Sequence, residues 1–201
     1  SCSKTGRSKA LFTWSTYYTQ GSPEVTSPTD TAKQRAATIR LLALDVDGIL
    51  TDGHIIYGNE GEELKAFNIK DGLGIKLLQQ GGVEVAIITG RKSAIVARRA
   101  SELGISQVVQ GREDKRQALE ELCRLCNVDI KECAYMGDDL PDLGAIVACG
   151  LGMTAADATD MVREAADWQS RRAGGEGAVR EACEFLLRAR GSWEDVTADY
   201  R

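Results

Sequence analysis

Residues 41–48 are Leu41-Leu42-Ala43-Leu44-Asp45-Val46-Asp47-Gly48. Four consecutive apolar residues predict a strand that is buried on both faces, and this run stops at an acidic residue. Two other apolar runs stop at polar residues as well, residues 83–88 before Thr89-Gly90-Arg91 and residues 134–136 before Gly137-Asp138. A fourth short run follows at residues 150–153. The chain therefore contains several short buried strands, each of the first three followed by polar residues.

Helical patterns lie between or after these runs, at residues 73–80, 93–103, 112–127, 154–166 and 176–190. Strands that alternate with helices predict a parallel sheet covered on both faces, so we expect a doubly wound α/β domain of the Rossmann-like kind. One segment departs from the alternation, because residues 54–57 and 63–67 flank Gly58-Asn59-Glu60-Gly61. This pattern predicts a β-hairpin inserted directly after the first strand.

Length and composition indicate one domain with peripheral ends. The chain has 201 residues, 43% of them hydrophobic, and its formal net charge is −5. Residues 1–38 are polar and lack periodicity apart from a short helix expected near residues 31–37, so we expect an N-terminal arm, a domain over residues 39–191 and a tail over residues 192–201. The acidic balance argues against nucleic acid as the main ligand. No apolar run approaches the roughly 18 residues of a membrane span, and no secretory signal pattern is present, so we expect a cytoplasmic protein.

The six cysteines are expected to be reduced thiols, most of them in apolar helix or strand patterns. Cys123 and Cys126 have the spacing of half a zinc or redox site, but no second pair and no histidine lies nearby. A packing role is therefore favoured over metal binding.

Polar residues follow three of the predicted strands. In open α/β sheets, ligands bind beyond the carboxyl ends of the strands. Asp45, Asp47, Thr89 and Asp138 lie at these ends, and Lys115 begins the helix before the third strand. Crowded carboxylates need a compensating cation, and oxygen ligands suit Mg²⁺. A carboxylate such as Asp45 can attack phosphorus, while Asp47 can protonate the leaving oxygen and then deprotonate water. The cation, Lys115 and Thr89 can neutralise the phosphoryl oxygens.

These motifs resemble the four signatures of the haloacid dehalogenase superfamily. They are Asp45-x-Asp47-Gly48-x-x-Thr51-Asp52-Gly53, Thr89-Gly90-Arg91, Lys115 and Gly137-Asp138-Asp139-x-x-Asp142. Residues 58–72, residues 86–92 and residues 173–181 resemble more specifically the 3-deoxy-D-manno-octulosonate 8-phosphate phosphatase family, and the similarity covers roughly residues 38–191. The resemblance implies a capless, magnesium-dependent phosphatase of lipopolysaccharide synthesis. It also implies a homotetramer in which the hairpins form a hub and a neighbouring subunit completes each site.

By position, the resemblance also implies roles for single residues. Asp45 is the nucleophile and a metal ligand, Asp47 is the acid/base and binds metal through its carbonyl, and Asp138 is the third metal ligand. Thr89, Gly90 and Lys115 hold the phosphate of the substrate. The residues implied on the sugar-acid side, beside Asp47 and Lys115, are Asn68, Lys70, Asp71, Gly72, Lys76, Arg91 and Arg99. Family members often have arginine at the positions of Lys70 and Lys76, and lysine lacks the planar two-point grip of arginine on a carboxylate.

Several alternatives stay open at this point. A phosphatase for a nine-carbon sialic or related acid 9-phosphate is compatible with Lys70 and Lys76. A non-catalytic, phosphatase-like assembly or regulatory domain is another possibility, although all the chemical positions are filled. Lys65 and Lys70 are compatible with solvated strand-edge charges, and Arg99 with a plain helix surface. Asp142 is expected to orient Lys115, and Asp52 is expected to hold its loop.

Overall fold

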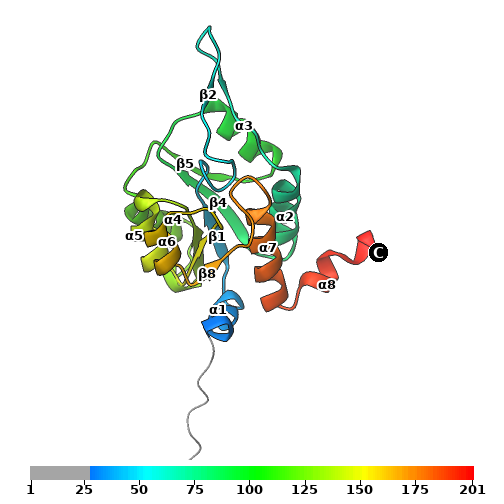
Figure 1. Cartoon of the computed structure of the whole chain (residues 1–201). Helices are drawn as coiled ribbons and strands as arrows, with labels where there is room; N and C mark the ends of the chain where they lie inside the picture. The colour runs from blue at the N-terminus through cyan, green and yellow to red at the C-terminus, as the bar shows by residue number, and fades with distance from the viewer. Residues whose placement is uncertain (1–27) are drawn as a thin grey trace, which may run out of the picture.

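The computed structural model describes residues 28–201, so predictions for residues 1–27 lie outside the described residues. A six-stranded parallel sheet forms the centre, with the strand order β5-β4-β1-β6-β7-β8 (Figure 1). The strands are β1 (Leu41–Leu44), β4 (Glu84–Thr89), β5 (Gln107–Gln110), β6 (Cys133–Met136), β7 (Leu151–Thr154) and β8 (Trp168–Gln169). The predicted doubly wound parallel sheet is therefore confirmed.

Helices cover both faces of the sheet, as the hydrophobic contacts of the strands require. In β1, Leu42 and Leu44 belong to one buried cluster, and Leu41 and Ala43 belong to the other. The helices that share the first cluster are α1 (Pro28–Ala36), α2 (Ile69–Gln80), α3 (Ala94–Glu102) and α7 (Ala178–Ala189). The helices that share the second are α4 (Lys115–Leu125), α5 (Leu140–Ala148) and α6 (Asp160–Ala165). The short helices η1 (Ile130–Glu132), α8 (Trp193–Val196) and η2 (Ala198–Tyr200) complete the described elements.

The predicted hairpin is present and projects from the body of the domain (Figure 1). Its antiparallel strands β2 (Ile56–Tyr57) and β3 (Glu63–Leu64) are only two residues long, shorter than the sequence indicates. Ile56 lies opposite Leu64, and these two side chains are exposed, as are Ile55 and Tyr57. The hairpin therefore presents apolar surface outside the core.

Three helix boundaries differ from the sequence-based expectation. Helix α2 begins at Ile69, four residues early, because the Asn68 side chain accepts a hydrogen bond from the Lys70 amide at 2.8 Å. Helix α4 begins late, at Lys115, because the Arg112 amide donates to the Thr89 carbonyl at 3.1 Å. This hydrogen bond continues the pairing of β5 with β4 beyond Gln110. The helix predicted over residues 154–166 is wrong in its first half, because β7 runs to Thr154 and α6 starts only at Asp160.

The two ends of the described chain both contact the core. Ala32 and Ala36 of α1 are buried, so packing begins before Ile39. At the other end, Trp193 packs against the core, and the Arg188 guanidinium lies 4.5 Å from the centroid of its ring. No helix among residues 28–201 combines the length and apolarity needed to cross a membrane.

The cysteines of the described residues are free thiols that serve mainly in packing. Four of them are buried and Cys126 is half-buried; the buried ones are Cys123, Cys133, Cys149 and Cys183. The expectation of core thiols is confirmed for these four, while Cys2 lies outside the described residues.

Candidate active site

Three neighbouring strands deliver polar side chains to one edge of the sheet. Asp45 follows β1, Thr89 ends β4, and Asp138 follows β6 by two residues. Strand β1 lies between β4 and β6, and the direction of winding reverses between β1 and β6. Ligands of open α/β sheets bind at such a reversal. The sequence-based expectation that these residues share one edge is confirmed.

A buried chain of hydrogen bonds and ion pairs fixes Asp45. The Lys115 ammonium lies 2.9 Å from Asp45 Oδ2 and 2.6 Å from Asp142 Oδ1. The Tyr135 hydroxyl also donates to Asp142 Oδ1, at 2.6 Å. All four side chains are at least nine-tenths buried. Because both partners of Lys115 are anchored, the ammonium is held in place at the tip of β1, and the expected contact of Asp142 with Lys115 is present.

The backbone around Asp142 explains why this carboxylate stays in position. Its Oδ2 accepts hydrogen bonds from the amides of Asp138 and Asp139, at 3.1 and 3.2 Å. Asp139 caps helix α5, and Asp142 completes a capping box at the same helix start. Both oxygens of Asp142 are therefore occupied by donors of this chain, which suits a positioning role.

Asp45 and Asp138 carry an electrostatic strain that a cation would relieve. Burial, followed by the charge of Asp142, raises the pKa of Asp45 to about 7, although Lys115 opposes the rise. Burial, followed by the charges of Asp142 and Asp45, raises the pKa of Asp138 to about 7 as well. Burial would lower the pKa of Lys115, but the carboxylates of Asp45 and Asp142 outweigh it and raise that pKa. Lys115 alone is therefore too little positive charge for these carboxylates.

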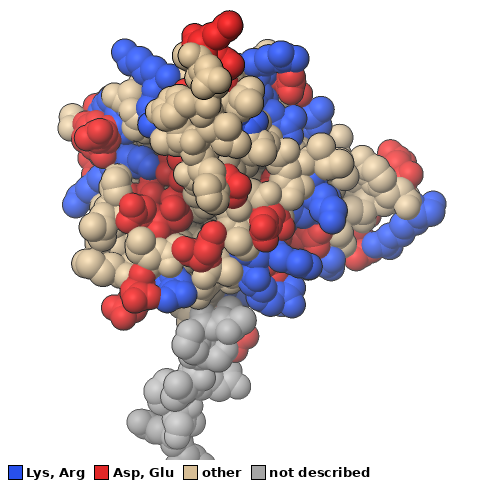
Figure 2. All heavy atoms as spheres, turned by 45° about the horizontal axis from the view of Figure 1, so that its top comes forward, with Lys and Arg blue, Asp and Glu red and all other residues tan. Residues whose placement is uncertain are grey.

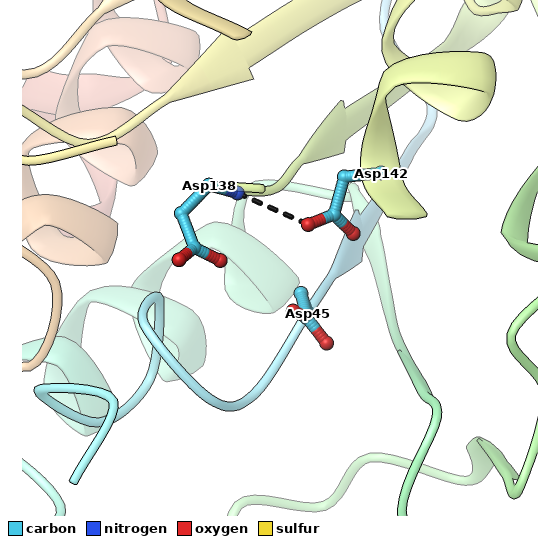
Figure 3. A group of neighbouring side chains, drawn as sticks. All are labelled: Asp45, Asp138 and Asp142. Atoms are coloured by element: carbon cyan, nitrogen blue, oxygen red, sulfur yellow. Dashed lines mark hydrogen bonds between the residues drawn. The ribbon is translucent and has the colours of Figure 1, made fainter. Parts of the chain in front are cut away.

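The geometry of the carboxylates fits a hard divalent ion. Figure 3 shows Asp45, Asp138 and Asp142 as close neighbours, and ligand atoms of the three lie within 4.8 Å of each other. Asp45 Oδ1 is buried without a hydrogen-bond partner, whereas both carboxylate oxygens of Asp142 already accept hydrogen bonds. A Cβ on Gly48 would overlap the Asp138 carboxylate, so the glycine leaves room for that side chain. Asp45 and Asp138 are thus the side chains best placed to hold Mg²⁺.

Asp47 is held differently from Asp45. Its Oδ1 accepts a hydrogen bond from the Lys65 ammonium, and the Lys65 side chain is only 1% exposed. Lys65 comes from the hairpin and also lies 3.3 Å from Glu63 Oε1. The sequence suggests a solvated charge for Lys65, and the structure corrects this. Two neighbouring carboxylates of one loop are therefore paired with two different lysines.

The residues expected at the phosphate surround the end of β4. Thr89 is 2% exposed, and its Oγ1 accepts a hydrogen bond from the Arg91 amide at 3.3 Å. A Cβ on Gly90 would make only an ordinary contact with Glu113, at 3.5 Å, so packing does not demand glycine there. Arg91 turns toward the hairpin, where its guanidinium lies 3.4 Å from the Tyr57 hydroxyl. On the face seen in Figure 2, a group of acidic side chains lies in a hollow of the surface.

Comparison with known proteins places this arrangement in a family. Residues 98–181 match the family model of haloacid dehalogenase-like hydrolases. The chain is 45% identical to 3-deoxy-D-manno-octulosonate 8-phosphate phosphatase of Yersinia pestis over 168 residues, 84% of this chain and 90% of that protein. The chain belongs to the 3-deoxy-D-manno-octulosonate 8-phosphate phosphatase family.

Solved structures of this phosphatase family have the same fold. The enzyme of Moraxella catarrhalis, in complex with a magnesium ion, a phosphate ion and a KDO molecule, is 47% identical, with a TM-score of 0.83; the match covers 85% of this chain and 98% of that one. The cobalt-bound enzyme of Haemophilus influenzae is 40% identical, with a TM-score of 0.77 and coverage of 79% and 93%. The predicted family and the hydrolase class of this phosphatase are therefore confirmed.

Two of the residues expected on the sugar-acid side of the phosphatase instead bond to the backbone of the same chain near the start of α7. Asn68 caps α2 and donates from Nδ2 to the Gly175 carbonyl at 3.0 Å. Asp71 is 1% exposed and accepts a hydrogen bond from the Arg180 amide, in the first turn of α7, at 2.7 Å. Burial raises the pKa of Asp71. Both side chains have clear structural partners within this chain.

Arg91, expected on the same side, lies beside the hairpin, whereas Lys70, Gly72, Lys76 and Arg99 lie on separate surfaces of the phosphatase. Gly72, Lys76 and Arg99 line a groove of about 220 Å³ between α2 and α3, together with Ile69, Leu73 and Leu103. The lining of that groove includes neither Asp45 nor Asp138. Lys70 lies at another pocket, beside the start of α7. Within one chain, these residues do not converge with the carboxylates.

Sequence reasoning missed two residues of the phosphatase site. Tyr135 sits in an apolar strand and gives no sign that its hydroxyl reaches Asp142. Lys65 lies in an alternating hairpin pattern, where a charge is typical of the solvated face. The one available signal was the position of Lys65 in the returning half of the predicted hairpin, which brings it back toward the loop that follows β1.

Proposed function

We propose that this protein hydrolyses 3-deoxy-D-manno-octulosonate 8-phosphate to the free sugar acid and inorganic phosphate, as a step in lipopolysaccharide synthesis. The observation that carries the proposal is the state of Asp45, whose Oδ2 is fixed by Lys115 while its Oδ1 is buried without a partner. A carboxylate oxygen held in this way is ready to attack phosphorus. The reaction of relatives about 45% identical over most of the chain supports the choice of substrate.

The chemistry assigned to the side chains has two steps. Asp45 Oδ1 attacks phosphorus and forms an aspartyl-phosphate, while Asp47 gives its proton to the departing sugar oxygen. Asp47 then takes a proton from a water molecule, which attacks the same phosphorus, releases phosphate and restores the Asp45 carboxylate. Lys115, Thr89 and the Gly90 amide hold the phosphoryl oxygens throughout. Splitting the reaction in this way avoids direct attack of water on the sugar phosphate.

We infer that Mg²⁺ is the cofactor and that Asp45, Asp138 and the Asp47 carbonyl hold it. When bound, Mg²⁺ supplies positive charge next to the phosphate and the crowded carboxylates. Support comes from the raised pKa values of Asp45 and Asp138 and from the proximity of the Asp45, Asp138 and Asp142 carboxylates, whose ligand atoms lie within 4.8 Å of one another. The magnesium ion in the Moraxella catarrhalis enzyme also fits this assignment.

The proposal includes a homotetramer in which a neighbouring subunit completes each site. Support comes from the exposed apolar side chains of the hairpin and from the position of Gly72, Lys76 and Arg99, which line a groove away from the carboxylates. Lys70 and Lys76 would meet the sugar acid from such a neighbour. A cytoplasmic location is also part of the proposal, because free thiols suit a reducing compartment.

The test is phosphate release by the magnesium-loaded protein from the eight-carbon sugar-acid phosphate. We expect turnover with the wild type and a loss on the order of 10⁴-fold in Asp45→Asn, because the nucleophile is removed. The exposed Asp199 offers a matched control, so Asp199→Asn is expected to keep full activity.

A parallel assay with a nine-carbon sugar-acid 9-phosphate decides the substrate. A higher kcat/KM for the nine-carbon compound would replace the eight-carbon assignment and leave the chemistry intact. Equal inactivity of the wild type and Asp45→Asn on a broad panel of phosphate esters would instead support a non-catalytic domain.

A further inference from the structure

The hairpin holds a buried lysine against the proposed acid/base. Lys65 follows β3, its side chain is 1% exposed, and its ammonium donates to Asp47 Oδ1. Lysine ammonium groups are seldom buried unless they are paired. This one has two acidic neighbours, because Glu63 Oε1 lies 3.3 Å away. Lys65 is therefore too enclosed to be a solvated charge at a strand edge.

A short series of contacts connects Lys65 with the rest of the hairpin. Glu63 lies opposite Tyr57 in the two-stranded ladder. The Arg91 guanidinium lies 3.9 Å from Glu63 Oε1 and 3.4 Å from the Tyr57 hydroxyl. Arg91 belongs to the loop after β4, and Thr89 is the last residue of that strand. The hairpin is thus fixed to the loops that follow β1 and β4.

Asp47 needs such a restraint more than Asp45 does. Asp45 directly follows a fully buried strand and contacts Lys115, whereas Asp47 lies on a loop and its side chain is 23% exposed. Gly48, the next residue, has a φ of +90°, a backbone conformation that glycine adopts easily. A loop carboxylate can adopt several rotamers, and proton transfer requires the one that reaches the leaving oxygen.

We propose that Lys65 is a positioning residue that holds Asp47 in the rotamer from which it protonates the leaving sugar oxygen. The inference rests on the proposed function, because it takes Asp47 as the acid/base. It also makes the placement of the hairpin a condition for proton transfer. An element that carries no catalytic residue of its own thereby controls the first chemical step.

The choice of leaving group separates this role from a merely structural one. A sugar alkoxide leaves only with a proton, whereas p-nitrophenolate leaves readily without one. The value of kcat/KM reports steps up to phosphorylation of Asp45, so it isolates the step in which Asp47 acts as an acid. For Lys65→Met we expect kcat/KM to fall at least about tenfold with the sugar phosphate, and to stay within about threefold with p-nitrophenyl phosphate.

Two further variants sharpen the test. Lys65→Arg keeps the cation and is expected to restore part of the lost kcat/KM for the sugar phosphate. Lys131→Met removes an exposed lysine of η1 and is expected to leave kcat/KM unchanged with both phosphate esters. Glu63→Gln keeps the size of its side chain but weakens its contact with Lys65, so a smaller loss with the same preference for the alkyl substrate is expected.

Equal losses with both phosphate esters, or no loss with either, would overturn the proposal. If Lys65→Met fails to fold, judged by its melting temperature, the same comparison in Lys65→Arg and Glu63→Gln decides. Failure of the substrate assignment is distinguishable. If the wild type prefers another alkyl phosphate, that ester takes the place of the octulosonate phosphate and the comparison with p-nitrophenyl phosphate stands.

Discussion

The edge of the sheet and the hairpin are built in opposite ways. At the edge, Asp45, Lys115, Asp142 and Tyr135 are buried and bonded to one another within one chain. In the hairpin, two strands of two residues carry apolar side chains that are mostly exposed. The comparison teaches that the groups assigned to phosphoryl transfer are preformed in the single chain, whereas the hairpin has surface that the single chain does not cover. Four predictions test this contrast.

Removal of Lys115 should have the largest effect, because it breaks the preformed edge. Lys115→Met leaves the Asp45 and Asp142 carboxylates buried without their cation. We therefore expect the free energy of unfolding of the metal-free protein to fall by about 3–5 kcal/mol. Activity should fall roughly 10³-fold, since a donor to the transferred phosphoryl group is lost. Thermal unfolding and phosphate release measure the two effects. Lys33→Met, at an exposed lysine of α1, is the control, and equal stability of the two variants would contradict the argument.

The hairpin should matter for assembly. Ile56 and Leu64 face each other across its strands and are 50% and 56% exposed. Replacing both by serine removes apolar contact area from the proposed hub, so we expect smaller species in analytical ultracentrifugation. Activity on the sugar-acid phosphate should fall by about tenfold or more as the neighbouring subunit is lost. Glu60→Gln in the hairpin turn should leave the assembly intact, and an unchanged sedimentation coefficient of the double variant would refute the hub.

The crowded carboxylates should make stability depend on pH in a direction opposite to that of most carboxyl groups. In the folded, metal-free protein the pKa values of Asp45 and Asp138 are about 7, whereas in the unfolded chain these groups ionise near pH 4. Between these pH values the folded state binds more protons, so the free energy of unfolding falls as the pH rises. The melting temperature without metal should therefore drop by roughly 5–10 °C between pH 5 and 8.

Saturating Mg²⁺ should remove most of this drop, because the bound cation favours the ionised carboxylates. Asp138→Asn should make the drop smaller in the metal-free protein, since it removes one of the two groups. Thermal scans with and without a chelator provide the measurement. A melting temperature without metal that stays constant over this range would show that the carboxylates are not strained.

The same contrast explains how far the sequence could predict the structure. The apolar runs before Asp45, Thr89 and Gly137 mark strands by burial, and sequence order then places their ends at one edge. Strands β5 and β8 were not predicted, because they are the two outermost strands of the sheet and contain glutamine in place of a continuous apolar run. Side-chain contacts across long sequence separations have no local pattern. The ion pair of Asp47 with Lys65, 18 residues away, is of this kind.

Tyr135→Phe should have the smallest effect, and it tests how rigid the preformed edge is. The hydroxyl donates to Asp142 Oδ1, which keeps a second donor in Lys115. Because Asp142 stays paired, we expect a loss of only about 1–2 kcal/mol in stability. Activity should fall about three- to tenfold as Lys115 becomes less fixed. Tyr200→Phe, at an exposed tyrosine near the C-terminus, serves as the control. Unchanged activity with reduced stability would mean that Lys115 and the backbone amides alone fix Asp142, and that the Tyr135 hydroxyl is not needed to position Lys115.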